Sequence, residues 1–453
     1  GQHLIRAYEL PTEVARADTS SFSVNHQQQE SESESLLRYG HSKDKRPDLL
    51  QYRQLLATLD PAGIPLVSAT LAGNGADDPL YWPTWQQMSK VIGHKQFVFL
   101  ADCKAGAIAT RASIASEGGI YCFPLPMTGQ NPELLKQWVL NPPAPSLEIR
   151  LPRQDEEEPA VGKGFEVELG KFWLNRETNQ WVRWHERYLV GYSHTLAAAA
   201  IRGQQQRLER ATAALSQLAA QPGDDLEQLQ TKVEAVLKRH RVQDFFALNI
   251  TTETISETRY LGRGRPTAKS PSEQVTRIEL QLKFQLQSAA IEQAEQLAGW
   301  RLYVTNAPTT RLTLPQAVIY YRDEWLLERG FHRFKRGRLP ALPLYFQNQD
   351  RIAGLMFLLT IALRVFTLIE FVVRQALQNA QQSLAGLYEG NPKRATARPS
   401  TEQMLKAFSH LTLYFLPDSR IFITPLSALQ RQILSLMKLP ESIYQLHLRP
   451  GKT

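Results

Sequence analysis

Residues 96–102, QFVFLAD, constrain the fold of this chain more than any other segment. Such an uninterrupted apolar run is typical of a strand buried on both faces of a parallel sheet. Parallel strands need crossover connections, usually helices, and helical patterns flank the run at residues 78–93 and 105–117. We therefore expect an α/β domain in which Asp102 ends a central strand, where open sheets gather functional groups. The alternative role for Asp102 is the N-cap of the following helix.

Three strand-like segments precede this run, and the first carries Asp18 near its middle. The second and third are joined by Asp60-Pro61-Ala62-Gly63, a strong turn signal, so the three are expected to form a meander. A further strand and helix follow Asp102. The segments are strands at 14–24, 51–59, 64–71 and 119–124, and a helix at 132–140.

Residues 321–335, YRDEWLLERGFHRFK, are predicted to form one charged amphipathic helix. Tyr321, Glu328 and Lys335 are spaced by seven residues, so they would project along one face. An apolar stripe would pack on the core. A cationic stripe beside Glu328 is suited to phosphate contacts, although a solvated charged face is the alternative. The apolar stripe is Tyr320, Leu327, Phe331 and Phe334, and the cationic stripe is Arg322, Arg329, Arg333 and Arg336.

Residues 144–306 depart from a simple α/β pattern and are predicted to form a β-rich insertion domain with a helical hairpin. The hairpin arms, 193–221 and 224–240, are broken at Pro222-Gly223, with Asp224 and Glu227 resembling a capping box. The segment Arg263-Gly264-Arg265-Pro266 resembles an AT-hook core, whose arginines enter a narrow minor groove. A basic hairpin loop is the alternative.

Composition and the long apolar segment indicate which kinds of partner this protein could bind. The net charge of +8 and pI near 9.3 favour an anionic partner, and two cysteines without metal-ligand spacing indicate a reducing cytoplasm. No signal sequence opens the chain. Residues 352–373 are apolar enough for a membrane span, but Arg364 and Glu370 interrupt them, so we expect a long helix, 349–382, buried in protein and no membrane partner.

Several of these segments resemble a known family. Tyr321-x6-Glu328-x6-Lys335, with Trp325 four residues after the tyrosine, is similar to the YREK signature of DDE-type bacterial insertion-sequence transposases. The contexts ADTSSFSV, GHSKDKRPDLLQ, AGNGADDPLY and ADCKAG also resemble that family. The resemblance implies a ribonuclease-H-like, retroviral-integrase-type mixed sheet with flanking helices, interrupted by the insertion domain.

The resemblance implies a metal-dependent enzyme acting on double-stranded DNA. Asp18, Asp102 and Glu328 would bind two divalent ions, Mg²⁺ or alternatively Mn²⁺, cut the transposon ends and join them to target DNA. A homodimer in a synaptic complex, in the bacterial cytoplasm at the nucleoid, is expected. The DNA-contacting candidates are Lys43, Arg46, Tyr321, Arg322, Trp325, Arg329, Arg333, Lys335, Arg263 and Arg265, with His41 and Lys104 as further candidates.

Two departures from the family keep alternatives open. The family places an arginine where this chain has Glu324, and the sequence begins seventeen residues before Asp18, which leaves no room for the usual helical end-recognition domain. A metal-dependent nuclease and an inactive DNA-binding remnant are therefore alternatives. The expected divisions are a core at 1–143, the insertion at 144–306, the rest of the core at 307–386, and a basic linker with a helical tail at 387–453.

Overall fold

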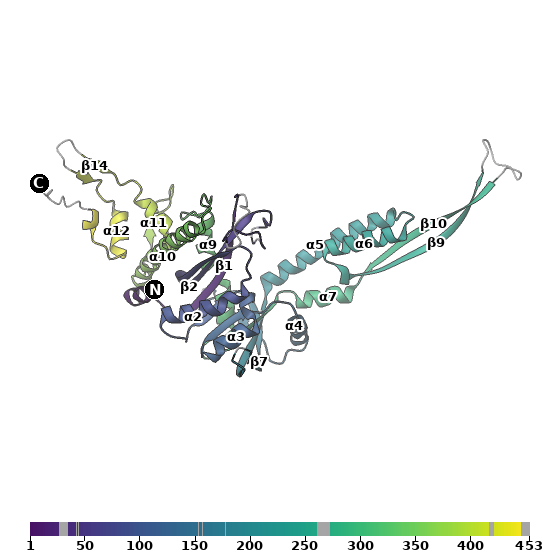
Figure 1. Ribbon diagram of the computed structural model, residues 1–453, viewed down its shortest axis with the longest axis horizontal. Coiled ribbons are helices and arrows are strands. Elements are labelled where there is room, and N and C mark those ends of the chain that lie inside the picture. The colour runs from purple at the N-terminus through teal and green to yellow at the C-terminus, as the bar shows by residue number, and fades with distance from the viewer. Residues whose placement is uncertain are drawn as a thin grey trace. The chain divides into compact units, whose positions relative to one another are not determined.

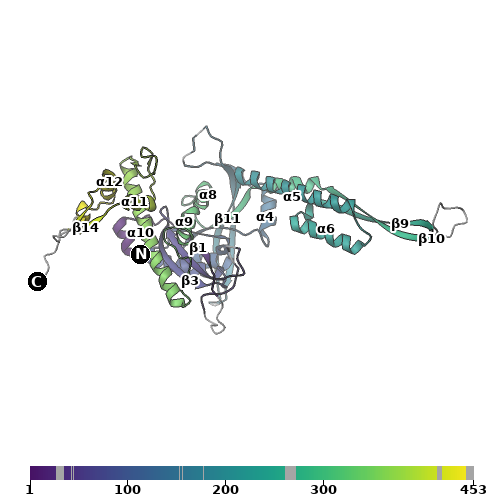
Figure 2. The same ribbon diagram turned by 90° about the horizontal axis from the view of Figure 1, so that it is seen from above.

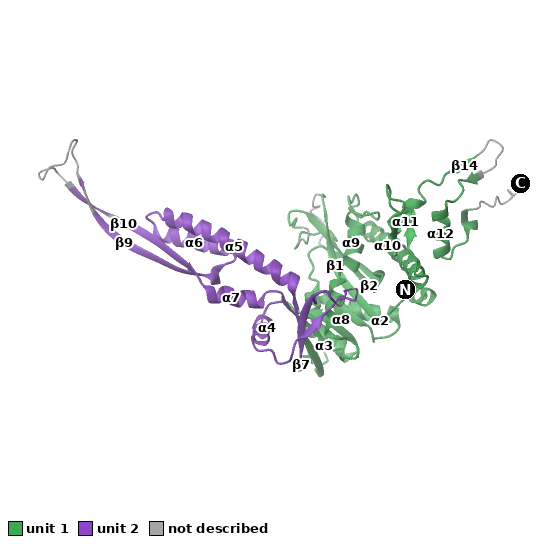
Figure 3. Ribbon diagram, turned by 180° about the vertical axis from the view of Figure 1, so that it is seen from behind, with its two compact units in different colours: residues 1–126, 168–189, 303–453 green, residues 127–167, 190–302 purple. Residues whose placement is uncertain are grey.

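The computed structural model describes residues 1–26, 35–41, 43, 45–152, 154–155, 157–176, 178–260, 272–415 and 421–444. The chain divides into two compact units (Figure 3), unit 1 being residues 1–126, 168–189 and 303–453, and unit 2 residues 127–167 and 190–302. Residues 168–189, predicted within the insertion, thus cluster with unit 1. Within this segment Glu186 forms a buried ion pair with Arg111 of unit 1, which donates to both carboxylate oxygens at 2.5 Å.

The largest sheet is mixed, with the strand order β3-β2-β1-β4-β5-β11-β8-β7-β6. Its first three strands form the predicted antiparallel meander, while β1, β4 and β5 run parallel. The predicted α/β class with a mixed sheet is confirmed. The strands are β1 Val14–Val24, β2 Leu50–Leu59, β3 Ile64–Ala72, β4 Val98–Ala101, β5 Ile120–Pro124, β6 Leu147–Ile149, β7 Gly162–Asn175, β8 Gln180–Ser193 and β11 Trp300–Thr305.

Helices cover both faces of this sheet in unit 1, with α9 and α10 on one side and α2 and α3 on the other (Figure 1). The α9–α10 side contains an apolar core in which Phe22 of β1 and Tyr52 of β2 pack with Phe334 of α9 and Met356 of α10. The helices of unit 1 are α1 Gln2–Tyr8, α2 Tyr81–Ile92, α3 Ile108–Ser116, α8 Leu314–Arg322, α9 Trp325–Lys335, α10 Gln349–Asn379, α11 Thr401–Ala407 and α12 Ala428–Leu436.

Short elements complete unit 1. Two small hairpins follow α10, and short 3-10 turns lie before α2, before α3 and after α12. Pro83 lies in the first turn of α2, where a missing N–H breaks no helical bond, so the helix continues through it. The hairpins are β12 Leu384–Ala385 with β13 Ala395–Thr396, and β14 Leu413–Phe415 with β15 Ile421–Ile423.

The predicted long apolar helix is α10, which Figure 2 shows crossing unit 1 beside the first strands. By length and composition it could cross a membrane. It packs on β3, where the Arg364 guanidinium donates to the Pro65 carbonyl at 2.8 Å, and Glu370 is buried. The expectation of a helix buried throughout is wrong in one respect, since Phe357 and Leu358 on its other face are exposed.

Unit 2 contains the predicted helical hairpin and a long two-stranded ribbon. Leu215 of the first arm packs with Val233 of the second and with Leu280 at the base of the ribbon. The second arm is capped by Asp225, not Asp224, since the Asp225 carboxylate accepts from the Gln228 N–H at 3.1 Å. The elements are α4 Asn131–Leu140, α5 His194–Ala220, α6 Leu226–His240, β9 Phe246–Tyr260, β10 Ser272–Leu286 and α7 Ser288–Leu297.

Candidate active site

The parallel register of β1 and β4 brings the first two predicted acids together. Ala17 pairs with Ala101, so Asp18 and Asp102 follow at the same level on adjacent strands, which lie ~4.8 Å apart in a sheet. Both acids line one pocket with Glu328 of α9. The two strands are therefore adjacent, as the resemblance to a ribonuclease-H-like sheet implies.

Asp102 both caps the turn that follows β4 and lines the pocket, which are the two roles suggested by its position at the end of a strand. Its carboxylate accepts the Lys104 N–H at 3.0 Å and so caps the short 3-10 turn after β4. The same oxygen, Oδ1, accepts the Tyr81 hydroxyl at 2.6 Å. Tyr81 is buried in α2, so its bond fixes the orientation of the Asp102 carboxylate. The other oxygen, Oδ2, receives neither of these two bonds.

Asp18 is the electrostatically perturbed acid of the pair. Burial raises its pKa to about 6, the Lys43 ammonium lowers the pKa in part, and the charge of Asp102 raises it again. Lys43 Nζ lies 3.4 Å from Asp18 Oδ1 and donates to the Thr19 carbonyl at 2.5 Å. A cation therefore already faces the Asp18 carboxylate, and two desolvated acids side by side favour a bound cation.

The segment 321–335 is not one helix, which corrects the prediction. It is divided between α8 and α9, with Asp323 and Glu324 in the turn between them. In a continuous helix the Tyr320 carbonyl would accept from the Glu324 N–H. Here the Arg16 guanidinium donates to that carbonyl at 2.8 Å, and the Glu324 N–H donates to the Tyr321 carbonyl instead, at 3.3 Å.

Buried ion pairing holds Arg16 at this turn. Its Nε and Nη2 donate to Asp60 at 2.5–2.9 Å, and both side chains are at most one-tenth exposed. Asp60 begins the predicted turn between β2 and β3. The contact therefore ties the β2–β3 turn to the end of α8, just before α9, from which Glu328 projects.

Glu328 and Glu324 share the pocket with the two aspartates. Glu328 is exposed, and among the described residues no side chain forms a hydrogen bond with its carboxylate. Across the same described ranges, no three His, Cys, Asp or Glu side chains already lie in a metal-binding arrangement. The three predicted acids therefore share a pocket, and the Glu328 carboxylate would have to turn for all three to bind one ion.

The Tyr321 side chain forms hydrogen bonds within the protein. Its hydroxyl donates to the Ala101 carbonyl at 3.1 Å and to the Cys122 carbonyl at 2.5 Å, and burial raises its pKa well above the ordinary value. These carbonyls lie at the carboxyl end of β4 and in β5. Tyr321 therefore anchors the end of α8 to the sheet, which contradicts a phosphate contact by its hydroxyl.

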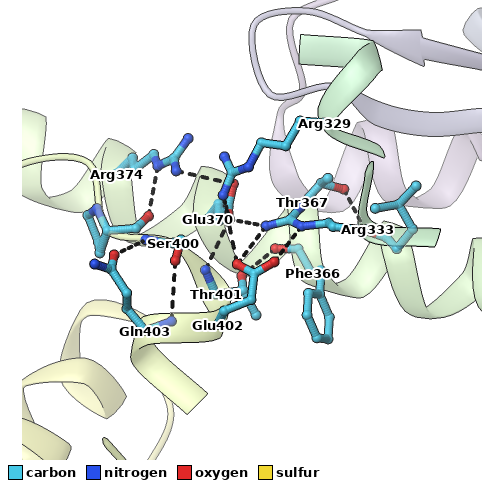
Figure 4. Close-up of polar contacts among 12 residues, drawn as sticks. Arg329, Arg333, Phe366, Thr367, Glu370, Arg374, Ser400, Thr401, Glu402 and Gln403 are labelled. Atoms are coloured by element: carbon cyan, nitrogen blue, oxygen red, sulfur yellow. Dashed lines mark hydrogen bonds and ion pairs between the residues drawn. The ribbon is translucent and has the colours of Figure 1, made fainter. Parts of the chain in front are cut away.

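Two arginines of the cationic stripe also have internal partners (Figure 4). Arg329 donates to Glu370 of α10 at 2.7 and 3.0 Å. Arg333 is buried, bonds Glu370 and donates to Glu402 of α11 at 2.7 and 2.9 Å. Arg374 lies 3.2 Å from the same Glu370. Arg333 therefore holds α9 on α10 and α11 and cannot contact DNA as predicted, while Arg329 is largely engaged.

The remaining DNA-contacting candidates lie in different places. Lys335 lies over the Phe22 ring at 5.2 Å, and Arg46 is paired with Asp48 at 2.6 Å. Trp325 and Arg322 are exposed near the turn between α8 and α9. Lys104 lies 3.8 Å from Asp78, and the backbone carbonyl of His41 accepts from Gln51. Arg263 and Arg265 lie outside the described residues.

Sequence reasoning did not identify three residues that shape the site, namely Arg16, Tyr81 and Asp77. Asp77 accepts from Arg53 at 2.5 Å and lies 3.7 Å from Lys43. Both Asp77 and Tyr81 belong to the run AGNGADDPLY, which was noted only for its resemblance. That run was the sequence signal that could have identified them, because in the structure its residues contact the side chains of Lys43 and Asp102.

Comparison with known protein families identifies the family of this chain. A family model described as "Transposase DDE domain" matches residues 11–365, which is most of the chain and includes all three acids. No curated protein matches the chain.

Proposed function

Since the chain belongs to the DDE transposase family, whose general function is DNA transposition and whose members generally use divalent metal ions, we propose that Asp18, Asp102 and Glu328 hold two Mg²⁺ ions. With these ions the protein would cut DNA at transposon ends and join the freed 3′ ends to target DNA. The observation that carries the proposal is the β1–β4 register, which places two acids side by side under the helix bearing the third.

The chemistry of the donor set fits this metal. All three side chains offer only carboxylate oxygens, which suit hard cations such as Mg²⁺. The raised pKa of Asp18 reflects a charge that burial and Asp102 both disfavour, so a divalent cation at this position would relieve the repulsion. When bound, two such ions would supply an activated water or 3′-hydroxyl and stabilise the leaving oxygen.

The chain's own residues prepare the site for that chemistry. Tyr81 and the Lys104 N–H hold one oxygen of Asp102, which leaves the other for a ligand. Lys43 faces Asp18 at 3.4 Å, and it would exchange this carboxylate for a DNA phosphate once a metal ion neutralises Asp18. Glu328 lies on a helix whose ends are fixed, so only its side chain needs to move.

DNA contacts are proposed for side chains of α8, of α9 and of the segment before β2. Trp325 would stack on an unpaired base, while Arg322 and Lys335 would contact phosphates on the α9 side. Arg46, together with Lys43, would contact a DNA strand that passes near β1. Arg263 and Arg265, which lie outside the described residues, are proposed as further contacts, and a homodimer assembled on paired ends is the proposed active species.

The test is Mg²⁺-dependent nicking and joining of labelled DNA that carries the element's terminal repeats. We expect Glu328→Gln to lose both activities by at least about 100-fold, because loss of mere outer-shell support for a metal ligand already costs about 10–100-fold. Glu117→Gln, an exposed acid paired with Lys95, is the matched control and should behave as wild type. Equal activity of Glu328→Gln and wild type would refute the proposal, and cutting without joining would indicate a nuclease.

A further inference from the structure

The hairpin of β7 and β8 exposes an aromatic pair that neither the core nor the acid pocket uses. The side chains of Phe172 and Trp181 are 68% and 61% exposed, and their rings lie 5.8 Å apart at an angle of 55°. Aromatic rings are usually buried, because each removes 150–250 Å² of apolar surface from water. Two adjacent exposed rings therefore indicate a surface that binds something.

A hollow of about 610 Å³ lies beside these rings. Its size falls within the range of small-ligand sites, ~300–1,000 Å³, so it would admit a nucleobase. Gly170 forms part of the lining, and a Cβ added there would meet no atom within 4 Å. A larger side chain at this strand position would therefore find free space beside the hollow.

Two cationic side chains, Lys171 and Arg183, line the hollow together with His185, and no acidic side chain does so among the described residues. Lys171 Nζ lies 4.8 Å from the centroid of the Tyr188 ring, which orients the ammonium. Aromatic faces interleaved with cations are what single-stranded nucleic acid requires, since bases stack on the rings and phosphates pair with the charges.

The strand that carries Trp181 is held firmly at its inner end. Trp184, which also lines the hollow, donates its indole N–H to Glu186 at 3.0 Å and to the Tyr121 hydroxyl at 2.9 Å. Glu186 is buried and also accepts from Tyr121 and Arg111. One wall of the hollow is therefore fixed to β5 and α3 before any ligand arrives, and a fixed surface loses less entropy on binding.

We propose that Phe172 and Trp181 form a stacking platform for unpaired bases of single-stranded DNA, with Lys171 and Arg183 contacting the flanking phosphates. The proposal rests on the proposed function, because strand cleavage creates unpaired ends that a second site in the same unit could hold. It adds a site remote in sequence from Trp325. Recognition by stacking makes the platform tolerant of base sequence and selective for unpaired strands over duplex.

The experiment measures binding of a fluorescently labelled 20-nucleotide single strand and of the matching duplex by anisotropy, with the full chain in EDTA. Trp181→Ala and Phe172→Ala should each weaken single-strand binding at least about fivefold, since stacking is worth ~1–3 kcal/mol per base. Duplex binding should change much less. Tyr345→Ala, which removes a side chain that is 83% exposed in the same unit, is the matched control and should bind like wild type.

Two further measurements separate stacking from other effects. Trp181→Ala should leave the dependence of affinity on salt unchanged, whereas Arg183→Ala should make it shallower by about 0.7 in the log–log slope. Gly170→Leu should fill the hollow and weaken single-strand binding without removing any contact.

Either of two results would overturn the platform. One is equal single-strand binding by wild type and both aromatic variants. The other is a change of oligomeric state in light scattering with single-strand binding intact, which would make the surface a protein interface. Because the assay contains no metal, its failure is distinguishable from failure of the Glu328 test, which measures cleavage.

Discussion

Replacing Asp18 by Asn is expected to stabilise the metal-free protein above about pH 6. Burial raises the pKa of Asp18 from 3.8 to about 6 in the folded protein, so the folded state binds this proton more tightly than the unfolded state. The free energy of unfolding therefore falls as pH rises from about 4 to 6. The two pKa values correspond to ~3 kcal/mol at most, and the remaining exposure of the side chain, 26%, reduces the expected gain to ~1–2 kcal/mol.

The assay is urea unfolding in EDTA between pH 4 and 8 for wild type, Asp18→Asn and the exposed control Asp244→Asn. The difference in free energy of unfolding between Asp18→Asn and wild type should be near zero at pH 4 and reach its full value above about pH 6.5. Added Mg²⁺ should stabilise wild type more than the variant, because only the folded wild type keeps the complete set of acids. A stability difference that does not change with pH, or an Asp18→Asn variant less stable than wild type at pH 8, would refute the raised pKa of Asp18 as its cause.

Two other substitutions test the supports of the site. Glu370→Gln should lower the free energy of unfolding by ~3–5 kcal/mol, because it leaves Arg333 and its neighbours without their buried charged partner. Urea unfolding measures this change, with the exposed Glu389→Gln as the control. An equal loss of stability in the two variants would contradict the prediction. Tyr81→Phe should weaken Mg²⁺ binding in titration calorimetry by about 10–100-fold, since it frees the Asp102 carboxylate, and unchanged affinity would show that the hydroxyl does not orient the ligand.

The buried strand that ends at Asp102 was predictable from local pattern, because an uninterrupted apolar run is typical of a strand covered on both faces. Its pairing with β1 was implied by the family resemblance and not by pattern, since a meander leaves both β1 and β3 with a free edge. In the structure Ala17 of β1 pairs with Ala101 of β4. Apolar positions of α9 were also predictable from local pattern, since Leu327, Phe331 and Phe334 recur with helical spacing and all lie in the core.

The break between α8 and α9 could not be predicted from local pattern. Residues 321–335 contain no proline, and no turn signal marks Asp323. The break accompanies a contact between Arg16 and the Tyr320 carbonyl, 304 positions apart in the chain. Helical periodicity likewise predicts that Arg329 and Arg333 share a face, but it cannot tell whether that face meets solvent or the carboxylate of Glu370, 37 residues beyond Arg333.

These two long-range contacts together explain how Glu328 is presented to the aspartates. Arg16, through Asp60 and the Tyr320 carbonyl, fixes the start of α9, and Arg333, through Glu370, fixes its end. Buried charge pairs of this kind add specificity of position more reliably than stability. The helix is therefore held at both ends while the Glu328 side chain between them stays exposed, which is the arrangement expected of an acid that must be near its partners yet adjust when a metal ion binds.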